Sequence, residues 1–259
     1  MAGGTRALPA VHDTGSGPAI LFLHAFPLDA SQWDHQVAAL SGRFRCVRVD
    51  VWGCGASPPA PDATGLSQFA GSVVEALDQR GIERFAACGL SMGGYVLWEL
   101  LRLVPQRLTH VALCSTRAAA DTPEGRRTRT ALAARVRDAG VESIVEENVV
   151  RLLSTHAQNE VHVADPVRAR IRRCTPEGVA WASLAMGARP DSTGLLPEIR
   201  VPSLVVAGAQ DVVMPSADQR SMAERMRGAE FAAFDGCGHL VNLEEPEAFS
   251  ERLEAFLIG

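Results

Sequence analysis

Short, almost continuously apolar segments alternate with longer amphipathic segments through the first half of this 259-residue chain. The apolar segments have the length of strands and lie at 19–24, 45–50, 84–89 and 109–115. Strands buried on both faces of a parallel sheet have this composition. The helix candidates between them lie at about 32–41, 66–80 and 92–104. This alternation predicts an α/β fold with a doubly wound, mostly parallel sheet.

The alternation stops at 117–196, where helix candidates follow one another without a strand. Three pairs, Thr122-Pro123, Asp165-Pro166 and Thr175-Pro176, combine a capping oxygen with a proline suited to the first helical position. Each pair predicts the start of a helix, and the segment as a whole predicts an insertion of four helices.

Strand and helix candidates alternate again after the insertion. The strands are expected at 203–208 and 229–234, and the helices at about 216–227 and 246–257. Because the sheet needs strands from both sides of the insertion, two independent domains are excluded. We expect a core formed by residues 1–116 and 197–259, and a helical cap formed by 117–196.

The overall charge and hydropathy exclude two classes of partner. The net charge is −5, and no basic patch indicates a nucleic-acid partner. No apolar run approaches the roughly 20 residues that cross a bilayer, and the first residues lack the apolar centre of a secretory signal. We expect a cytoplasmic protein that binds neither nucleic acid nor membrane; the sequence does not predict its oligomeric state.

The six cysteines form no C-x-x-C pair, and a chain of this length does not need disulfides to fold. All six are therefore expected to be reduced thiols. Histidine and cysteine show no spacing typical of a metal site, so we expect no metal and no cofactor.

The segment CGLSMGG at 88–94 places a serine at a junction between a strand and a helix. Gly89 and Gly93 complete the pattern G-x-S-x-G around Ser91, and side chains at these two positions would collide with neighbouring backbone. A sharp turn of this kind raises the serine hydroxyl above the sheet edge in a strained conformation. A plain glycine-rich turn is the alternative, but the strand–turn–helix context favours a nucleophile.

A serine nucleophile needs a base, and the base needs an orienting acid. His239 follows the last strand in a loop with glycines at 236 and 238, and it is the histidine best placed to serve as the base. Asp211 closely follows the strand at 203–208, at the sheet edge where ligands bind in open α/β folds. Asp235 and Asp218 are its rivals, and the predicted triad is Ser91, Asp211 and His239.

Acyl transfer also needs hydrogen-bond donors for the developing oxyanion. The backbone N–H of Met92 follows the nucleophile, and the N–H of Phe26 belongs to the loop after the strand at 19–24. His24 stands at the end of that strand and is expected to make structural hydrogen bonds.

Taken together, these segments resemble the α/β-hydrolase superfamily. The resemblance rests on HAFP at 24–27, DVWGCGAS at 50–57, GLSMG at 89–93, GAQD at 208–211 and GCGH at 236–239. It extends over the whole chain and implies the α/β-hydrolase fold, with the helical insertion where this family carries its cap. Small esterases and 3-oxoadipate enol-lactone hydrolases are the most similar members, followed by cofactor-free haloperoxidases and perhydrolases.

Two positions depart from that resemblance. Ala25 stands where the family usually has glycine, and Trp52 stands where it often has arginine. We expect Trp52 to shape the substrate pocket. Trp181, the only tryptophan of the insertion, is expected to line the pocket as well, because aromatic walls are common in ligand sites.

The sequence therefore predicts a serine hydrolase that cleaves carboxylic esters or lactones through an acyl-enzyme. Its expected substrates are short-to-medium neutral esters. Perhydrolysis or haloperoxidation with the same triad and hydrolysis of 3-oxoadipate enol-lactone are the enzymatic alternatives. A ligand receptor without turnover is a remote one, since no triad residue is missing.

Overall fold

The computed structural model describes residues 7–62 and 64–259, in which seven strands form a single sheet. The strand order is β1-β3-β2-β4-β5-β6-β7; β1 pairs antiparallel with β3, and all other neighbours are parallel. The strands are β1 (Val11–Thr14), β2 (Ala19–Leu23), β3 (Arg45–Val49), β4 (Phe85–Leu90), β5 (Leu108–Cys114), β6 (Ser203–Gly208) and β7 (Glu230–Phe234). The predicted fold class is confirmed.

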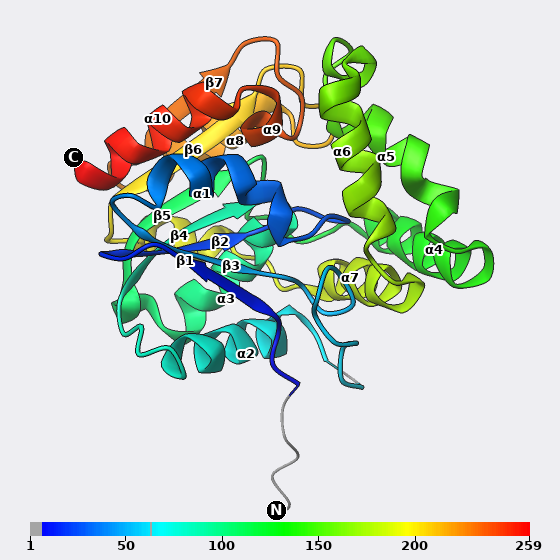
Figure 1. Ribbon diagram of the computed structural model, residues 1–259, viewed down its shortest axis with the longest axis horizontal. Coiled ribbons are helices and arrows are strands. Elements are labelled where there is room, and N and C mark those ends of the chain that lie inside the picture. The colour runs from blue at the N-terminus through cyan, green and yellow to red at the C-terminus, as the bar shows by residue number, and fades with distance from the viewer. Residues whose placement is uncertain (1–6, 63) are drawn as a thin grey trace, which may run out of the picture.

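Helices cover both faces of the sheet (Figure 1). On one face α1 (Asp34–Leu40) and α10 (Pro246–Ile258) contribute to one hydrophobic core; on the other, α2 (Leu66–Asp78), α3 (Met92–Leu103) and α8 (Ser216–Glu224) contribute to a second. Strand β4 is buried throughout, with Ala86, Cys88 and Leu90 in the first core and Phe85 and Ala87 in the second. This two-sided burial explains why the strands are apolar at successive positions.

Four helices form the segment between β5 and β6. They are α4 (Pro123–Ala139), α5 (Val145–Leu152), α6 (Val161–Arg172) and α7 (Pro176–Ala188). Figure 1 shows them gathered at one end of the sheet, away from the C-terminus. Because β5 and β6 are paired neighbours, the chain leaves the sheet and returns beside its point of departure.

Short helices complete the fold. They are α9 (Val241–Glu244), η1 (Ala30–Trp33), η2 (Pro105–Arg107), η3 (Val141–Ile144), η4 (Ala157–Asn159) and η5 (Thr193–Glu198), the η elements being 3-10 helices. In the part of the chain that the structure describes, no helix combines the length and apolar character needed to span a bilayer.

Two of the three predicted helix starts are confirmed. The side chains of Thr122 and Thr175 cap α4 and α7 by accepting hydrogen bonds from the N–H groups three residues later. The third is wrong, since Pro166 lies inside α6. Pro166 has no N–H to donate to the His162 carbonyl, so α6 lacks that hydrogen bond.

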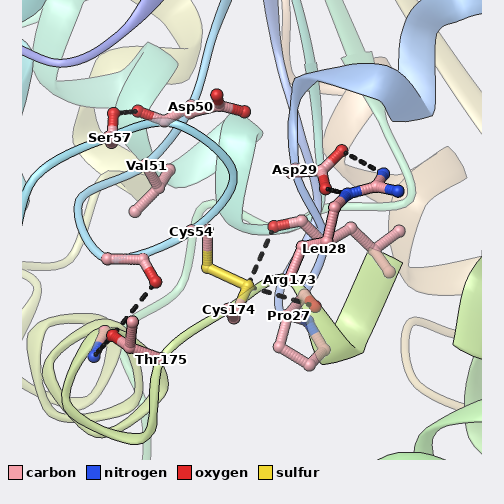
Figure 2. Close-up of a disulfide and its surroundings, with 12 residues drawn as sticks. Pro27, Leu28, Asp29, Asp50, Val51, Cys54, Ser57, Arg173, Cys174 and Thr175 are labelled. Atoms are coloured by element: carbon pink, nitrogen blue, oxygen red, sulfur yellow. Dashed lines mark hydrogen bonds and ion pairs between the residues drawn. A yellow bond between two sulfur atoms is a disulfide. The ribbon is translucent and has the colours of Figure 1, made fainter. Parts of the chain in front are cut away.

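The expectation that all six cysteines are reduced is wrong. Cys54, after β3, forms a disulfide with Cys174, between α6 and α7, across 120 residues of sequence (Figure 2). The other four cysteines, at 46, 88, 114 and 237, are free and buried. Spacing could not reveal the pair because tertiary packing creates it.

The two segments that carry the disulfide pack backbone against backbone. The Thr175 N–H donates to the Gly53 carbonyl at 2.7 Å. A Cβ atom on Gly53 would lie 2.4 Å from the Cα of Gly178, so no larger residue fits at this contact. The disulfide therefore joins the helical segment to the loop after β3.

Candidate active site

Ser91 occupies the turn between β4 and α3 in a strained backbone conformation. Its φ of 56° is in the left-handed region, which non-glycine residues seldom adopt. Two hydrogen bonds hold the turn: the Ser91 N–H donates to the Cys114 carbonyl at 2.8 Å, and the Thr116 hydroxyl donates to the Ser91 carbonyl at 2.9 Å. The turn directs the serine side chain out of the sheet layer and toward the helical segment.

The glycines that flank this turn are required by space. A Cβ atom on Gly89 would lie 2.5 Å from the Gly93 carbonyl oxygen, and one on Gly93 would lie 2.0 Å from the Leu23 carbonyl oxygen. The pattern G-x-S-x-G is thus required because β4, α3 and β2 approach one another closely beneath the serine.

Asp211 and His239 lie next to each other at the same sheet edge. The carboxylate oxygen Oδ2 of Asp211 is 2.8 Å from Nδ1 of His239, and both residues are buried. The second oxygen, Oδ1, accepts hydrogen bonds from the N–H groups of Val213 and Met214, each at 2.8 Å. The rivals Asp218 and Asp235 are exposed.

The loop that carries His239 is attached to the end of α5. The N–H groups of His239 and Leu240 both donate to the Leu152 carbonyl, at 3.0 and 3.1 Å. Glu244 accepts hydrogen bonds from the N–H groups of Gly238, at 3.0 Å, and Ser154, at 3.2 Å. Burial raises the pKa of the Glu244 carboxyl, against these hydrogen bonds.

The sequence analysis does not identify Glu244 as a site residue. No motif distinguishes it from the glutamate beside it. Its role depends on the approach of α5 to the histidine loop, which only the folded chain shows.

Phe26 and Met92, the predicted oxyanion donors, belong to the loop after β2 and to the start of α3. Met92 is the first residue of α3, where a backbone N–H has no partner within the helix. Within residues 7–62 and 64–259, neither N–H donates to a protein acceptor. Both are therefore available to a ligand oxygen.

His24 holds the loop of Phe26 in place. Its Nε2 accepts from the Val51 N–H at 2.9 Å, so its Nδ1 carries the proton and donates to the Ala25 carbonyl at 2.9 Å. Burial lowers the pKa of His24, which favours this neutral form. The arrangement agrees with the structural role expected for His24.

Ser91 and His239 line one cavity of about 270 Å³. Its apolar wall is formed by Phe26, Leu132, Leu152, Met186, Val213 and Met214. Its polar wall is formed by Tyr95, Arg117, Asp121, Thr128, Arg129, Asn148 and Arg151. Nε2 of His239 is buried and has no hydrogen-bond partner among the described residues, as expected of a base that waits for a hydroxyl or a substrate.

The two tryptophans predicted to shape the pocket lie outside this cavity. Their rings pack against each other, with centroids 5.2 Å apart, and both contact Phe69. Nε1 of Trp52 donates to the Ala7 carbonyl and Nε1 of Trp181 to the Thr64 carbonyl, each at 3.0 Å. They fix α7 to the core, and we correct the expectation accordingly.

The cavity is lined by a residue with a hydroxyl, by an imidazole paired with a carboxylate and by Phe26, and the N–H of Met92 directly follows the hydroxyl-bearing residue in the chain. This set of groups is suited to acyl transfer. Elsewhere in residues 7–62 and 64–259, no group of three or more His, Cys, Asp or Glu side chains is arranged to hold a metal ion.

Comparisons with known proteins identify the family of the chain. A model of the alpha/beta hydrolase family matches residues 20–252. The chain is 27% identical to 3-oxoadipate enol-lactonase 2 of Acinetobacter baylyi over 241 residues, which cover 93% of this chain and 88% of the relative.

Solved structures resemble the whole chain. A thermophilic esterase from Thermogutta terrifontis has a TM-score of 0.93 and 35% identity, covering 96% of this chain and 92% of its own. The enol-lactonase from Burkholderia xenovorans has a TM-score of 0.89 and 30% identity, covering 97% and 96%.

Proposed function

Since this chain belongs to the alpha/beta hydrolase family, we propose that it hydrolyses carboxylic esters or lactones through an acyl-enzyme on Ser91. The observation that carries the proposal is the cavity shared by Ser91 and His239, in which His239 is bonded to Asp211 at 2.8 Å while its other nitrogen is free.

The reaction follows from the positions of these groups. Nε2 of His239 takes the proton of the Ser91 hydroxyl as the oxygen attacks the substrate carbonyl carbon. Asp211 stabilises the imidazolium, and the N–H groups of Phe26 and Met92 donate to the oxyanion. The imidazolium then protonates the leaving alkoxide. Water, deprotonated by His239, attacks the acyl-enzyme and releases the acid.

The size and walls of the cavity favour small substrates. A volume of about 270 Å³ holds a short ester or a single lactone ring. The relatives are named enol-lactonase and esterase, which supports lactones and esters as the substrate class of this chain. Residues of α4, α5 and α7 form much of the wall, so the segment 117–196 serves as the cap that sets substrate choice.

The test is the Ser91→Ala variant, assayed with 4-nitrophenyl butyrate and labelled with a fluorophosphonate. Turnover should fall by roughly 10³-fold or more, because the triad acts as a unit, and labelling should disappear. Ser221→Ala, at an exposed position of α8, is the matched control and should keep both. Labelling that persists at another serine would refute the proposal.

A further inference from the structure

The polar wall of the Ser91 cavity carries an excess of positive charge. Arg117, Arg129 and Arg151 line it, and Asp121 is the only carboxylate among its lining residues. The carboxylate of Asp211 lies behind His239 and is engaged with it. A cavity built for a purely neutral substrate has no need of three guanidinium groups.

Asp121 does not neutralise this wall. It accepts from Nη2 of Arg117 at 2.6 Å and from Nε of Arg129 at 2.5 Å, and it also pairs at 2.7 Å with Arg189, which is buried behind the wall. One negative charge is thus shared by three positive ones. Among the residues that the structure describes, Arg151 has one distant ion-pair partner, Glu147 at 3.9 Å.

Two buried polar atoms of the wall lack partners among the described residues. The hydroxyl of Tyr95, a residue that is 1% exposed, makes no hydrogen bond, nor does Nε of Arg117. Tyr95 is the only tyrosine of the chain and stands one helical turn after Ser91. The two groups lie close together: burial alone would lower the pKa of Arg117, but Tyr95 and Asp121 raise it. A buried polar atom without a well-formed hydrogen bond costs about 1–3 kcal/mol, so this pair offers one site for a polar ligand group.

We infer that Tyr95, Arg117, Arg129 and Arg151 form a carboxylate-binding subsite, and that the preferred substrates are esters or lactones bearing a free carboxylate. The inference rests on the proposed function and names its substrate class. It also reverses the expectation of neutral substrates. The arginines of α6 and its C-terminal end, Arg168, Arg170, Arg172 and Arg173, do not line this cavity. Arg168 and Arg172 pair with exposed glutamates, and Arg173 pairs with Asp29.

The test compares monomethyl succinate with methyl levulinate, in which a methyl ketone replaces the carboxylate at nearly equal size. Methanol release gives kcat/KM for both. We expect the anionic ester to be preferred by about tenfold or more, as charge-assisted hydrogen bonds of about 1.4 kcal/mol or more imply. Raising the salt concentration should reduce this ratio, because part of the wall is open to solvent.

Substitutions in the subsite test whether it causes the preference for the anionic ester. Arg117→Gln, Arg151→Gln and Tyr95→Phe should each lower the ratio of anionic to neutral kcat/KM by several-fold. Arg135→Gln is the matched control, since it removes an equal charge from α4 and a partner of the same Glu147 but lies outside the cavity. Its ratio should equal that of the parent. Tyr95→Phe and Arg151→Gln leave no buried charge unpaired, so folding does not obscure the result.

The outcomes separate the two proposals. If the fluorophosphonate does not label Ser91 in the parent chain, the proposed function and the carboxylate subsite are both overturned. Turnover that depends on Ser91 with equal rates for the two esters, or a preference that all three subsite variants retain, would overturn only the carboxylate subsite. If both esters turn over slowly, they are compared as protectors of Ser91 against the fluorophosphonate; equal protection would likewise overturn the subsite.

Discussion

Asp211 accepts three hydrogen bonds, and one of them belongs to the proposed chemistry. Its Oδ1 fixes the loop after β6 through Val213 and Met214, while its Oδ2 pairs with His239. Asp211→Asn can keep the bonds to Oδ1 but cannot stabilise an imidazolium. We expect kcat to fall by roughly 10⁴-fold with little loss of stability, measured with 4-nitrophenyl butyrate and by thermal unfolding.

The exposed Asp235 provides the control for that substitution. Asp235→Asn changes a carboxylate in the histidine's own loop and should leave kcat within about twofold, since exposed substitutions away from the site have small effects. A severe loss in Asp235→Asn together with a mild one in Asp211→Asn would contradict the assignment of the acid.

Gly93 provides a test of the turn itself. In Gly93→Ala the new methyl group would lie 2.0 Å from the Leu23 carbonyl oxygen, so β2 and α3 must separate and move Ser91. Labelling and turnover should both fall by more than about tenfold. Gly42→Ala, whose Cβ would meet nothing within 4 Å, should behave like the parent. Equal labelling and turnover in the two variants would show that β2 and α3 can separate without moving Ser91, and would contradict this prediction.

A functional residue can be predicted from the sequence when its role depends on residues close to it in the chain. Ser91 is marked by a turn whose requirements fall on its own neighbours, and His239 and Asp211 follow strands whose ends meet at one edge. Trp181 was predicted from its residue type alone, and packing against Trp52 and Phe69 decides its position. The subsite around Asp121 joins four segments that no local pattern connects.

At the scale of elements, the disulfide links a loop of the sheet domain to the helical segment. It closes a span of 120 residues, and a crosslink of this length restricts the unfolded chain strongly. Reduction should therefore lower the free energy of unfolding by about 3–5 kcal/mol, measured by urea unfolding with and without a reductant.

The variant in which both Cys54 and Cys174 are serine supplies the control. It should match the reduced parent in stability, and added reductant should not change it further. The other four cysteines are buried, free thiols, so they leave nothing else to reduce. A loss of stability on reduction that persists in the double variant would contradict this account.

The elements that sequence patterns identify are those whose periodicity reflects burial. Strands β2 to β6 have neighbours on both sides in the sheet and are largely apolar because helices cover them, whereas the edge strand β1 reads VHDT, pairs with β3 alone and exposes half of its residues. An edge strand of this kind has no apolar run to detect.

At the scale of the whole molecule, contacts of several kinds join the sheet domain to the helical segment, among them the disulfide and the Trp52–Trp181 packing. Within the helical segment, the cluster of Asp121 with Arg117, Arg129 and Arg189 connects the residues after β5 with α4 and the end of α7. The same cluster forms the back of the proposed subsite, so stability and substrate choice depend on one carboxylate.

The pH dependence of folding should reveal that carboxylate. Burial alone would raise the pKa of Asp121, but Arg129 and Arg189 lower it to about 2, below the usual 3.8. A lowered pKa stabilises the folded state above pH 4, and the contribution disappears as the pH falls toward 2. For a shift of this size, the contribution to the free energy of unfolding is about 2 kcal/mol.

Asp121→Asn should thus be less stable than the parent at pH 6, and the difference should shrink below pH 4. Asp138→Asn, at an exposed position of α4, should show no such pattern. Urea unfolding at pH 6, 4 and 2.5 measures all three proteins, and a difference between parent and Asp121→Asn that stays constant with pH would contradict the role of the cluster.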